Sequence, residues 1–260
     1  QVLLSQLVGV NGKPEEAVDF ARQAYERYNR LLGSEHPATI DSMASVASTL
    51  DDAGRYEESA PLHRQALADA LRVLGETHEL VGIIRANLAI LLARQGFNEE
   101  ALQLHRDDYE TALRTLGQEH PATMSAMGDI AVALTRVGRV DEAEPIMIES
   151  YQLRARVLGD THPGTLNAQF QLCNFLLKAD RLDEAEPYCV EGYRLHQEIL
   201  GDESIGTLMS QGAVGNLRRK QGRIDEARAI FEDALERRTA ILGTDHPLTE
   251  RTRDSLERLE

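Results

Sequence analysis

The sequence predicts an all-α protein built as a solenoid of antiparallel helix pairs, and three observations support this prediction. A Leu-Gly pair recurs every 42 residues without an insertion, at Leu32-Gly33, Leu74-Gly75, Leu116-Gly117, Leu158-Gly159, Leu200-Gly201 and Leu242-Gly243. Within each period a turn, usually marked by a second glycine, separates two segments of helical length. The helix formers Ala, Leu, Glu, Arg and Gln dominate the composition. A fixed period with two helices per unit is typical of a repeat architecture.

The composition argues against several classes of protein. The 260 residues are 42% hydrophobic and 27% charged, which fits a globular chain better than a disordered or membrane protein. No segment approaches the ~18 consecutive apolar residues that a spanning helix needs. The net charge of -15, from 43 acidic and 28 basic residues, argues against a nucleic-acid-binding surface. We therefore expect a cytoplasmic protein with neither a membrane nor a nucleic acid as partner.

The start of the chain and its two cysteines lead to further expectations. The apolar start QVLLSQLVGV lacks a basic flank and a cleavage site of small residues, so it does not resemble a signal peptide. Because an initiator Met is also missing, we expect that the chain belongs to a longer protein. Cys173 and Cys189 make no disulfide framework or zinc pattern. They could be neighbours in one helix pair, but we expect reduced, buried thiols.

The period assigns the elements in chain order within a single domain, 1–260. A partial leading repeat (1–33) precedes five full repeats (34–243), and a trailing segment (244–260) carries a lone helix near 248–260 that is polar enough to cap the array. The first helices of the full repeats are expected near 38–53, 80–95, 122–137, 164–179 and 206–221. The second helices are expected near 56–73, 98–115, 140–157, 182–199 and 224–241, where acidic clusters such as RVDEAEP favour a helix start.

The linker between repeats reads LGSEHPAT from Leu32 and recurs with small changes. Its Gly is expected to end one helix in a left-handed cap, the residue before Pro to be extended, and Pro to begin the next helix. The linker histidines are His36, His78, His120, His162 and His246, with Ser204 in the remaining copy. Copies in neighbouring repeats should lie ~10 Å apart, whereas zinc ligands each lie ~2 Å from the ion. We interpret these histidines as structural and expect neither metal nor cofactor.

Further rows of residues at equivalent repeat positions predict the turn within each repeat and the packing of the core. The turn glycines are Gly12, Gly54, Gly96, Gly138 and Gly222, and Asp180 is expected to adopt the same left-handed conformation. Small residues recur at Ala47, Ala89, Ala131, Cys173 and Gly215, and at Ala66, Asp108, Ser150, Gly192 and Ala234. Larger apolar rows alternate with them, which predicts an interdigitated core. His63 and His105 align with Met147, Cys189 and Phe231 as core fillers, whereas His196, Arg154 and Arg238 suggest an exposed face.

The segment NLAILLARQGFNEEALQLH, which begins at Asn87, carries a family resemblance. A 42-residue helical period alone would also admit armadillo or HEAT repeats. The Asn-Leu-Ala, Gln-Gly and Glu-Ala spacing of this segment resembles a tetratricopeptide repeat instead. Together with the added LGxxHPxT linker, it is similar to the repeats of kinesin light chain and of their bacterial relatives. The resemblance covers essentially the whole chain and implies a right-handed α-solenoid.

The resemblance also implies a ligand groove, because the first helix of each pair lines the concave face of tetratricopeptide arrays. One groove position near the end of each first helix holds Asp52, Arg94, Arg136, Lys178 and Lys220, and Arg219 adds a neighbour. Other positions offer the amides of Asn87, Asn167, Gln171, Asn174 and Asn216 and the apolar side chains of Ile83, Ile90, Val132, Phe170, Leu177 and Met209. The first repeat differs and shows Asp41, Asp51 and Asp52 with Ser45 and Ser48.

These positions lead to the hypothesis of a non-catalytic interaction module for an extended, acidic peptide or partner segment. Basic groups ~10 Å apart match carboxylates about three residues apart on a strand that rises ~3.3 Å per residue. Amide side chains can hydrogen-bond a peptide backbone in both directions, and the apolar positions would accept side chains. The acidic first repeat would favour a basic residue at one end of the ligand.

Other interpretations stay open at this stage. The groove could take a ligand of another kind, or the basic row could be solvated helix ends that complement the helix dipole. The chain could instead be a regulatory or assembly segment of a larger bacterial kinase, NTPase or protease, packing on its catalytic domain or self-associating. No Gly-rich phosphate loop, G-x-S-x-G, H-E-x-x-H or paired-carboxylate arrangement appears, so we do not expect an enzyme.

Overall fold

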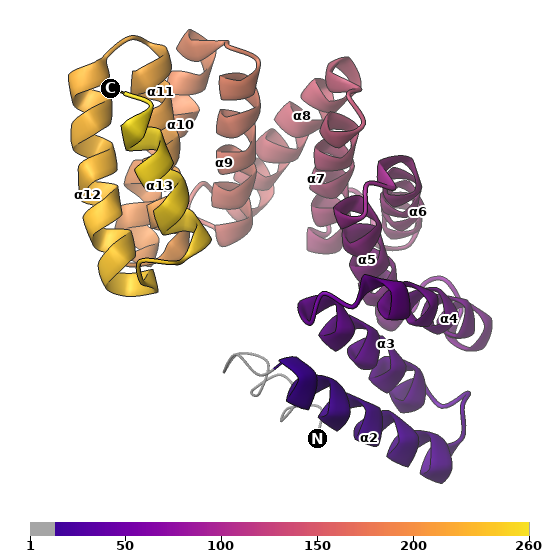
Figure 1. Ribbon diagram of the computed structural model, residues 1–260. Coiled ribbons are helices and arrows are strands. Elements are labelled where there is room, and N and C mark those ends of the chain that lie inside the picture. The colour runs from indigo at the N-terminus through magenta and orange to yellow at the C-terminus, as the bar shows by residue number, and fades with distance from the viewer. Residues whose placement is uncertain (1–13, 260) are drawn as a thin grey trace. The chain divides into compact units, whose positions relative to one another are not determined.

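The computed structural model describes residues 14–259, whose regular structure is entirely helical (Figure 1). The helices are α2 (Pro14–Leu32), α3 (Pro37–Asp52), α4 (Tyr56–Leu74), α5 (Glu79–Arg94), α6 (Asn98–Leu116), α7 (Pro121–Arg136), α8 (Val140–Leu158), α9 (Pro163–Lys178), α10 (Leu182–Leu200), α11 (Ile205–Lys220), α12 (Ile224–Leu242) and α13 (Pro247–Glu257). The all-α prediction is confirmed, and both ends of every helix in the five full repeats agree with it to within one residue. Gly12 lies outside the described residues.

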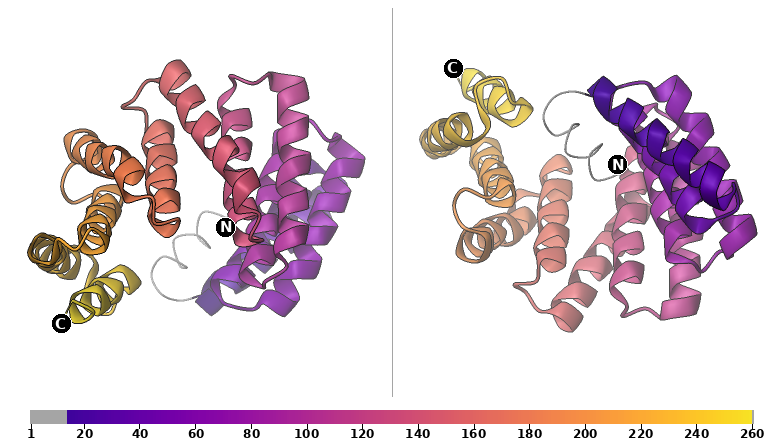
Figure 2. Two further views of the ribbon diagram at one scale, coloured as in Figure 1. Left: turned by 90° about the horizontal axis from the view of Figure 1, so that it is seen from above. Right: turned by 90° about the horizontal axis from the view of Figure 1, so that it is seen from below.

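The chain divides into two compact units, Gln1–Glu144 and Pro145–Glu260. Successive helices pack on each other, from α2 to α7 in the first unit and from α9 to α13 in the second (Figure 2). First helices also touch the first helix of the next repeat, α3 with α5 and α9 with α11. The first helices of a unit therefore lie side by side. The assignment of one domain to residues 1–260 stays a prediction.

Each linker between repeats begins with a glycine-specific backbone conformation. Gly75 has φ 79° and ψ 160°, and Gly117 and Gly201 have closely similar angles. The expected positive φ is confirmed. The expected left-handed helical cap is wrong, because ψ near 160° places these residues in a region that is essentially restricted to glycine. The linker glycine is therefore more strictly required than a simple helix cap would demand.

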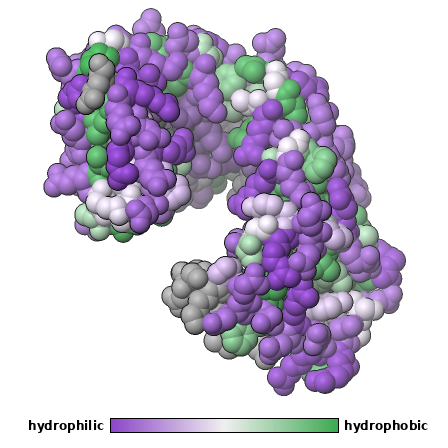
Figure 3. All heavy atoms as spheres, viewed as in Figure 1, coloured by the Kyte–Doolittle hydropathy of each residue, from purple (hydrophilic) through white to green (hydrophobic). Residues whose placement is uncertain are grey.

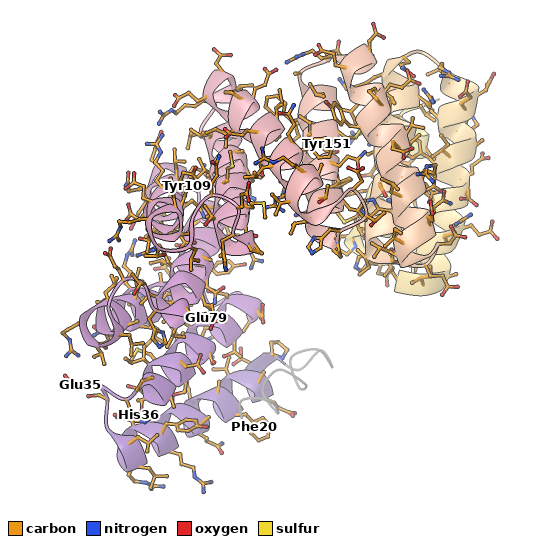
Figure 4. The ribbon with its side chains drawn as sticks, turned by 180° about the vertical axis from the view of Figure 1, so that it is seen from behind. Phe20, Glu35, His36, Glu79, Tyr109 and Tyr151 are labelled. Carbon is orange, nitrogen blue, oxygen red and sulfur yellow. A yellow bond between two sulfur atoms is a disulfide. The ribbon has the colours of Figure 1, made fainter. Side chains whose placement is uncertain are left out.

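The linker histidines are the N-caps of the first helices. His78 has extended backbone angles, and its Nδ1 accepts a hydrogen bond from the backbone N–H of Leu80 at 3.1 Å. The same cap recurs at the other linker histidines, His36 (labelled in Figure 4), His120, His162 and His246. Ser204 caps its helix by accepting from the backbone N–H of Thr207 at 3.1 Å. A side-chain acceptor at this position satisfies an amide that the helix leaves unpaired, so the structural interpretation is confirmed.

Positions 16 residues apart on the two helices of a repeat face each other. In the fifth repeat, Gly215 of α11 lies so close to Phe231 of α12 that a Cβ atom on residue 215 would come within 2.6 Å of the ring. Phe231 is only 2% exposed. The glycine thus makes room for a large buried ring, as the alternating rows of small and large residues predicted. The turn prediction is also confirmed, because Asp180 has φ 61° beside glycines such as Gly54 at 74°.

The equivalent facing positions of the fourth repeat hold a disulfide between Cys173 of α9 and Cys189 of α10 (Figure 4). The prediction of reduced thiols is therefore wrong. The Cα atoms lie 5.1 Å apart, within the range that a disulfide requires, and both residues are buried. The helix pair brings the two sulfur atoms together because the cysteines occupy the positions that hold Gly215 and Phe231 in the fifth repeat, which also face each other.

The expectation that His196, Arg154 and Arg238 lie on an exposed face is wrong, because all three are buried. Arg154 donates to the carbonyl oxygen of Gly164 at 2.8 Å, and Arg238 donates to that of Leu248 at 3.1 Å. Both oxygens belong to the first turn of the following first helix. Nδ1 of His196 lies 2.7 Å from the carbonyl oxygen of Gly192. The hydrogen bonds to backbone oxygens offset part of the cost of burying these polar side chains.

Asp108 departs from its row of small residues because it pairs with a buried arginine. Arg85 of α5, whose side chain is only 6% exposed, lies 3.1 Å from the carboxylate of Asp108 on α6. Arg85 stands where the neighbouring repeats have Met43 and Met127. A buried guanidinium needs a counter-charge, which Asp108 supplies. The second repeat thus replaces an apolar contact by an ion pair.

Candidate functional site

The surface of each first helix carries a line of residues spaced at i, i+4, i+7 and i+11, which we call the stripe residues. On α5 they are Ile83, Asn87, Ile90 and Arg94. Ile83 and Ile90 are 49% and 50% exposed, although polar residues predominate on the face in view in Figure 3. The equivalent stripe residues elsewhere are Asp41, Ser45, Ser48 and Asp52 on α3, Ser125, Asp129, Val132 and Arg136 on α7, Asn167, Gln171, Asn174 and Lys178 on α9, Met209, Ala213, Asn216 and Lys220 on α11, and Arg251 and Ser255 on α13 with Arg258 directly after it.

In the first unit, the stripe residues of neighbouring first helices contact each other. Asn87 of α5 donates from Nδ2 to the hydroxyl oxygen of Ser48 on α3 at 3.5 Å. Arg94 and Arg136 are exposed at the ends of α5 and α7, and neither forms an ion pair within residues 14–259. The pKa of His105 is lowered by burial, while Asp108 raises it and the charge of Arg136 lowers it further. The predicted residues Asn87 and Arg94 thus lie on the stripe of α5, and Arg136 lies on the stripe of α7.

The acidic character of α3 is weaker than predicted, because Asp51 does not belong to the stripe. Its carboxylate lies 2.9 Å from Nε2 of His63 and also accepts a hydrogen bond from the hydroxyl of Ser59, both on α4. Asp51 is therefore part of the packing between α3 and α4. Asp41 and Asp52 remain on the stripe, and burial raises the pKa of Asp41.

In the second unit, the stripe residues of α9 and α11 are mostly amides. Nδ2 of Asn174 donates to the carbonyl oxygen of Phe170 at 2.9 Å, and Nδ2 of Asn216 donates to that of Gly212 at 3.0 Å. Each bond fixes the amide and leaves its oxygen able to accept a hydrogen bond. Asn167 is exposed and Gln171 is half-buried on the same stripe. The amide positions named from the sequence are thus brought together on adjacent helices here.

The two lysines of the predicted basic row, Lys178 and Lys220, differ in whether their charge is paired. Nζ of Lys220 lies 2.8 Å from a carboxylate oxygen of Asp180, so its charge is already compensated. Lys178 is exposed and forms no ion pair within the described part of the chain. Arg219, predicted beside Lys220, is half-buried and lies off the stripe. Among the described residues at this end of the stripes in the second unit, Lys178 alone therefore offers an uncompensated charge.

Two adjoining cavities lie beside the stripes of the second unit and share Phe170 and Met209 in their walls. One, of about 240 Å³, is mainly apolar and is also lined by Leu166, Asn167, His196 and Leu200. The other, of about 270 Å³, reaches from Asn174 and Asn216 to α13. Leu177, which was named as an apolar groove contact, is buried and lines neither cavity, so that prediction is wrong.

The contribution of α13 is the part of the site that sequence reasoning missed. Arg251, Ser255 and Arg258 line the cavity of about 270 Å³, although the trailing helix was interpreted only as a polar cap. The signal was present, because these residues follow Met209, Ala213 and Asn216 by one period of 42 residues. The stripe pattern therefore continues into α13.

The geometry offers binding surfaces of helical stripes and shallow cavities. No group of three or more His, Cys, Asp or Glu residues within 14–259 is placed to hold a metal ion. None of the helices α2–α13 combines the length and apolar character needed to cross a membrane. What the stripes present is a combination of charges, amide groups and apolar side chains that can act by equilibrium binding.

Comparisons with known proteins agree with this architecture. A tetratricopeptide repeat profile matches residues 3–72, 47–110, 166–239 and 210–260, and a second profile of the same description matches residues 123–164. No curated protein matches the sequence.

Several solved structures have a similar fold. A Podosopora anserina protein described as a kinesin light chain with nearly identical TPR-like repeats has a TM-score of 0.67 at 24% identity, over 76% of this chain and 94% of that one. BtubC (BKLC) from P. vanneervenii has a TM-score of 0.73 at 18% identity, over 90% of this chain and 94% of that one. A Rap protein complexed with competence and sporulation factor has a TM-score of 0.58 at 14% identity, over 98% of this chain and 72% of that one.

Proposed function

This chain belongs to the tetratricopeptide repeat family, and from that premise we propose that it is a non-catalytic interaction module that binds an extended, acidic peptide segment along its stripe residues. The observation that carries the proposal is the set of exposed bases Arg94, Arg136 and Lys178, none of which has an ion pair within residues 14–259. Many other basic residues of this acidic chain are paired, as Arg64 is with Glu100 at 2.7 Å. Unpaired bases at one repeat position are available for a ligand.

The neighbouring stripe residues supply the other contacts that an extended peptide needs. The amide oxygens of Asn174 and Asn216 can accept hydrogen bonds from peptide N–H groups. The exposed side chains of Ile83 and Ile90 can receive apolar side chains of the ligand. Because Lys220 is already paired with Asp180, we assign it a smaller part than its place in the row suggested.

A structural relative also supports the proposal. The Rap protein with the same type of fold was solved in complex with competence and sporulation factor. Tetratricopeptide folds of this type are generally protein–protein interaction scaffolds, and a binding role for this chain is an extension of that property. The acidic chemistry of the ligand is argued from the bases of this chain alone.

The proposal is tested with defined peptides. The probe is a set of fluorescein-labelled decapeptides with Glu at every third position, and the matched set carries Gln instead. Fluorescence anisotropy should detect tighter binding of the Glu set, and the difference should shrink at high salt because exposed charges are screened. The variant Arg136→Glu with Lys178→Glu should weaken binding of the Glu set by about tenfold or more.

The control is Arg27→Glu with Arg253→Glu, which makes the same change in net charge at exposed positions off the stripes. It should bind like the wild type, and circular dichroism should show equal helicity in all three proteins. Equal binding of the Glu set to the wild type and to the stripe variant would refute the assignment of the site.

Self-association or docking on a flanking domain of a longer protein would appear as concentration-dependent mass in light scattering. A cytoplasmic location would have to accommodate the disulfide between Cys173 and Cys189, since reducing compartments disfavour such bonds. Thiol labelling of the protein in its native cells would show which state it holds there.

A further inference from the structure

The cavity of about 270 Å³ in the second unit, which we call the α13 pocket, is lined by more positive than negative charge. Its charged lining residues are Arg238 of α12, Arg251 and Asp254 of α13, and Arg258 directly after the end of α13. Three guanidinium groups and one carboxylate leave two positive charges uncompensated. This local excess contrasts with the net charge of -15 of the whole chain.

Arg238 is the deepest of these charges and lacks a charged partner in the described structure. It is 5% exposed and donates hydrogen bonds to the carbonyl oxygens of Leu248 and Leu208 and to the hydroxyl of Thr252. All three acceptors are neutral, and its Nε has no partner among residues 14–259. Burial lowers the pKa of Arg238, and the nearby charge of Arg251 lowers it further. Buried charges in proteins are ordinarily paired, so this site lacks a counter-charge.

Arg251 and Arg258 add charge at the mouth of the same pocket. Arg251 on α13 and Arg258 directly after it are both exposed, and neither forms an ion pair within the described part of the chain. Asp254 lies three residues after one and four before the other, the spacings at which helical ion pairs form. It pairs with neither within residues 14–259, so it lowers the positive potential without neutralising it.

We propose that the α13 pocket binds a phosphoryl monoester on a partner protein, that is, a phosphorylated Ser, Thr or Tyr residue. A phosphoryl group carries a charge of about -1.5 to -2 at neutral pH, which matches the excess of two positive charges. A carboxylate carries only one negative charge and would leave one positive charge of the pocket uncompensated. The planar fork of arginine also fits phosphate oxygens with two parallel hydrogen bonds.

The remaining walls of the pocket suit the rest of a phosphorylated residue. Asn174 and Asn216 each keep a second amide hydrogen to donate after their bonds to their own helices. Phe170 and Met209 form an apolar wall beside the arginines. The pocket opens onto the stripes of α9 and α11, so this inference rests on the proposed peptide-binding function and adds a modification requirement to it.

The test uses degenerate nonapeptide libraries with a fixed central residue. Three libraries carry phosphoserine, phosphothreonine or phosphotyrosine, and two matched libraries carry Glu or Ser. Fluorescence anisotropy with the full chain should show at least one phosphorylated library binding about tenfold or more tightly than the Glu library. That preference should diminish between pH 7 and pH 5, because the second phosphate pKa is about 6. Inorganic phosphate should compete in the millimolar range if the phosphoryl group alone is recognised.

Substitutions locate the effect. Arg251→Glu with Arg258→Glu should abolish the preference for phosphate, whereas Arg27→Glu with Arg253→Glu should leave it intact at the same net charge. Arg253 is a matched control on α13 itself, because it is exposed and does not line the pocket. Asp254→Asn should tighten binding, since it removes the one negative charge of the lining. Circular dichroism would confirm that these exposed substitutions leave the fold unchanged.

The outcomes separate this inference from the proposed function. Equal binding of the phosphorylated and Glu libraries would overturn the phosphate pocket and leave the acidic-peptide stripe intact. A phosphate preference that survives in the Arg251→Glu, Arg258→Glu variant would overturn the location. A preference that depends on these two arginines, together with binding of the Glu decapeptides that Arg136→Glu with Lys178→Glu leaves unchanged, would support the pocket and refute the proposed stripe.

Discussion

Opening the disulfide between Cys173 and Cys189 should weaken the second unit by an amount that the structure allows us to work out. The two cysteines are 16 residues apart in sequence and join α9 to α10. A cross-link that closes a loop of this length stabilises the folded state by about 3 kcal/mol, chiefly by restricting the unfolded chain. Cys173→Ala with Cys189→Ala should therefore lose about 3 kcal/mol of unfolding free energy.

The facing positions offer a variant that restores packing without the bond. In the sequence of the preceding repeat these positions hold Ala131 and Met147, both of which are buried. Cys173→Ala with Cys189→Met should regain about 1.5–3 kcal/mol over the double alanine variant, which is the value of burying one methionine side chain. Its stability should also be the same with and without a reducing agent.

Urea unfolding followed by circular dichroism, with and without reductant, measures these differences. With a slope of about 2 kcal/mol per molar urea, a loss of 3 kcal/mol lowers the midpoint by about 1.5 M. Mass spectrometry of the alkylated protein would verify which form is present. If the oxidised and reduced wild-type proteins unfold at the same urea concentration, the reasoning about the cross-link is refuted.

Three further predictions concern single residues. Gly215→Ala should lose about 1–3 kcal/mol of stability, because its methyl group would lie 2.6 Å from the Phe231 ring. In Gly82→Ala the added methyl group would lie 3.4 Å from a carboxylate oxygen of Asp108, so this variant should instead gain up to about 1 kcal/mol of unfolding free energy. Equal effects of the two glycine substitutions in urea unfolding would contradict the packing argument. His78→Ala should lose about 1 kcal/mol by removing the cap on Leu80, whereas His78→Ser should keep it as Ser204 does; thermal unfolding that fails to separate the two variants would count against the cap. Burial lowers the pKa of His105 below its ordinary value of 6.5 in the unfolded chain. The stability that the neutral His105 side chain contributes is therefore complete above pH 6.5, and it is lost as the pH falls through the lower pKa of the folded state. His105→Met should reduce the loss measured by urea unfolding between pH 7.5 and 5.5, and an unchanged loss would exclude this residue as a cause.

The helices were predictable because their ends are encoded by local chemistry. The linker glycine stops one helix, and the histidine three residues later caps the next, as at Gly75 and His78. Both effects depend on a few neighbouring residues, so the 42-residue period located every boundary of the full repeats. The ψ value of the glycine was not predictable in the same way, because a positive φ is compatible with more than one type of turn.

The errors share a different cause, which is that a period identifies equivalent positions without identifying what covers them. Arg154 was expected at the surface, but it meets a carbonyl oxygen of the next helix. Asp51 was expected in the groove, but it bonds residues of α4. An arginine or aspartate has the same sequence pattern whether it faces water or a buried partner.

The candidate site was partly predictable for the same reasons. The stripe residues Asn87, Arg94 and Arg136 follow from helical geometry once the register is known. The ion pair between Lys220 and Asp180 was not visible, because it joins residues one repeat apart through an exceptional non-glycine turn. The α13 pocket was missed because the trailing helix was judged by its polarity alone, although its residues continue the period.

Photo-crosslinking of the acidic decapeptides tests most directly whether the stripe residues bind the ligand. A benzophenone group placed near the middle of the peptide would label nearby residues, and mass spectrometry of the digested protein would locate them. We expect labels on the stripe residues of α5, α7, α9, α11 and α13, competed by unlabelled Glu peptide and not by Gln peptide. Labels confined to the second helices α4, α6, α8, α10 and α12 would contradict the central claim that the first helices form the binding surface.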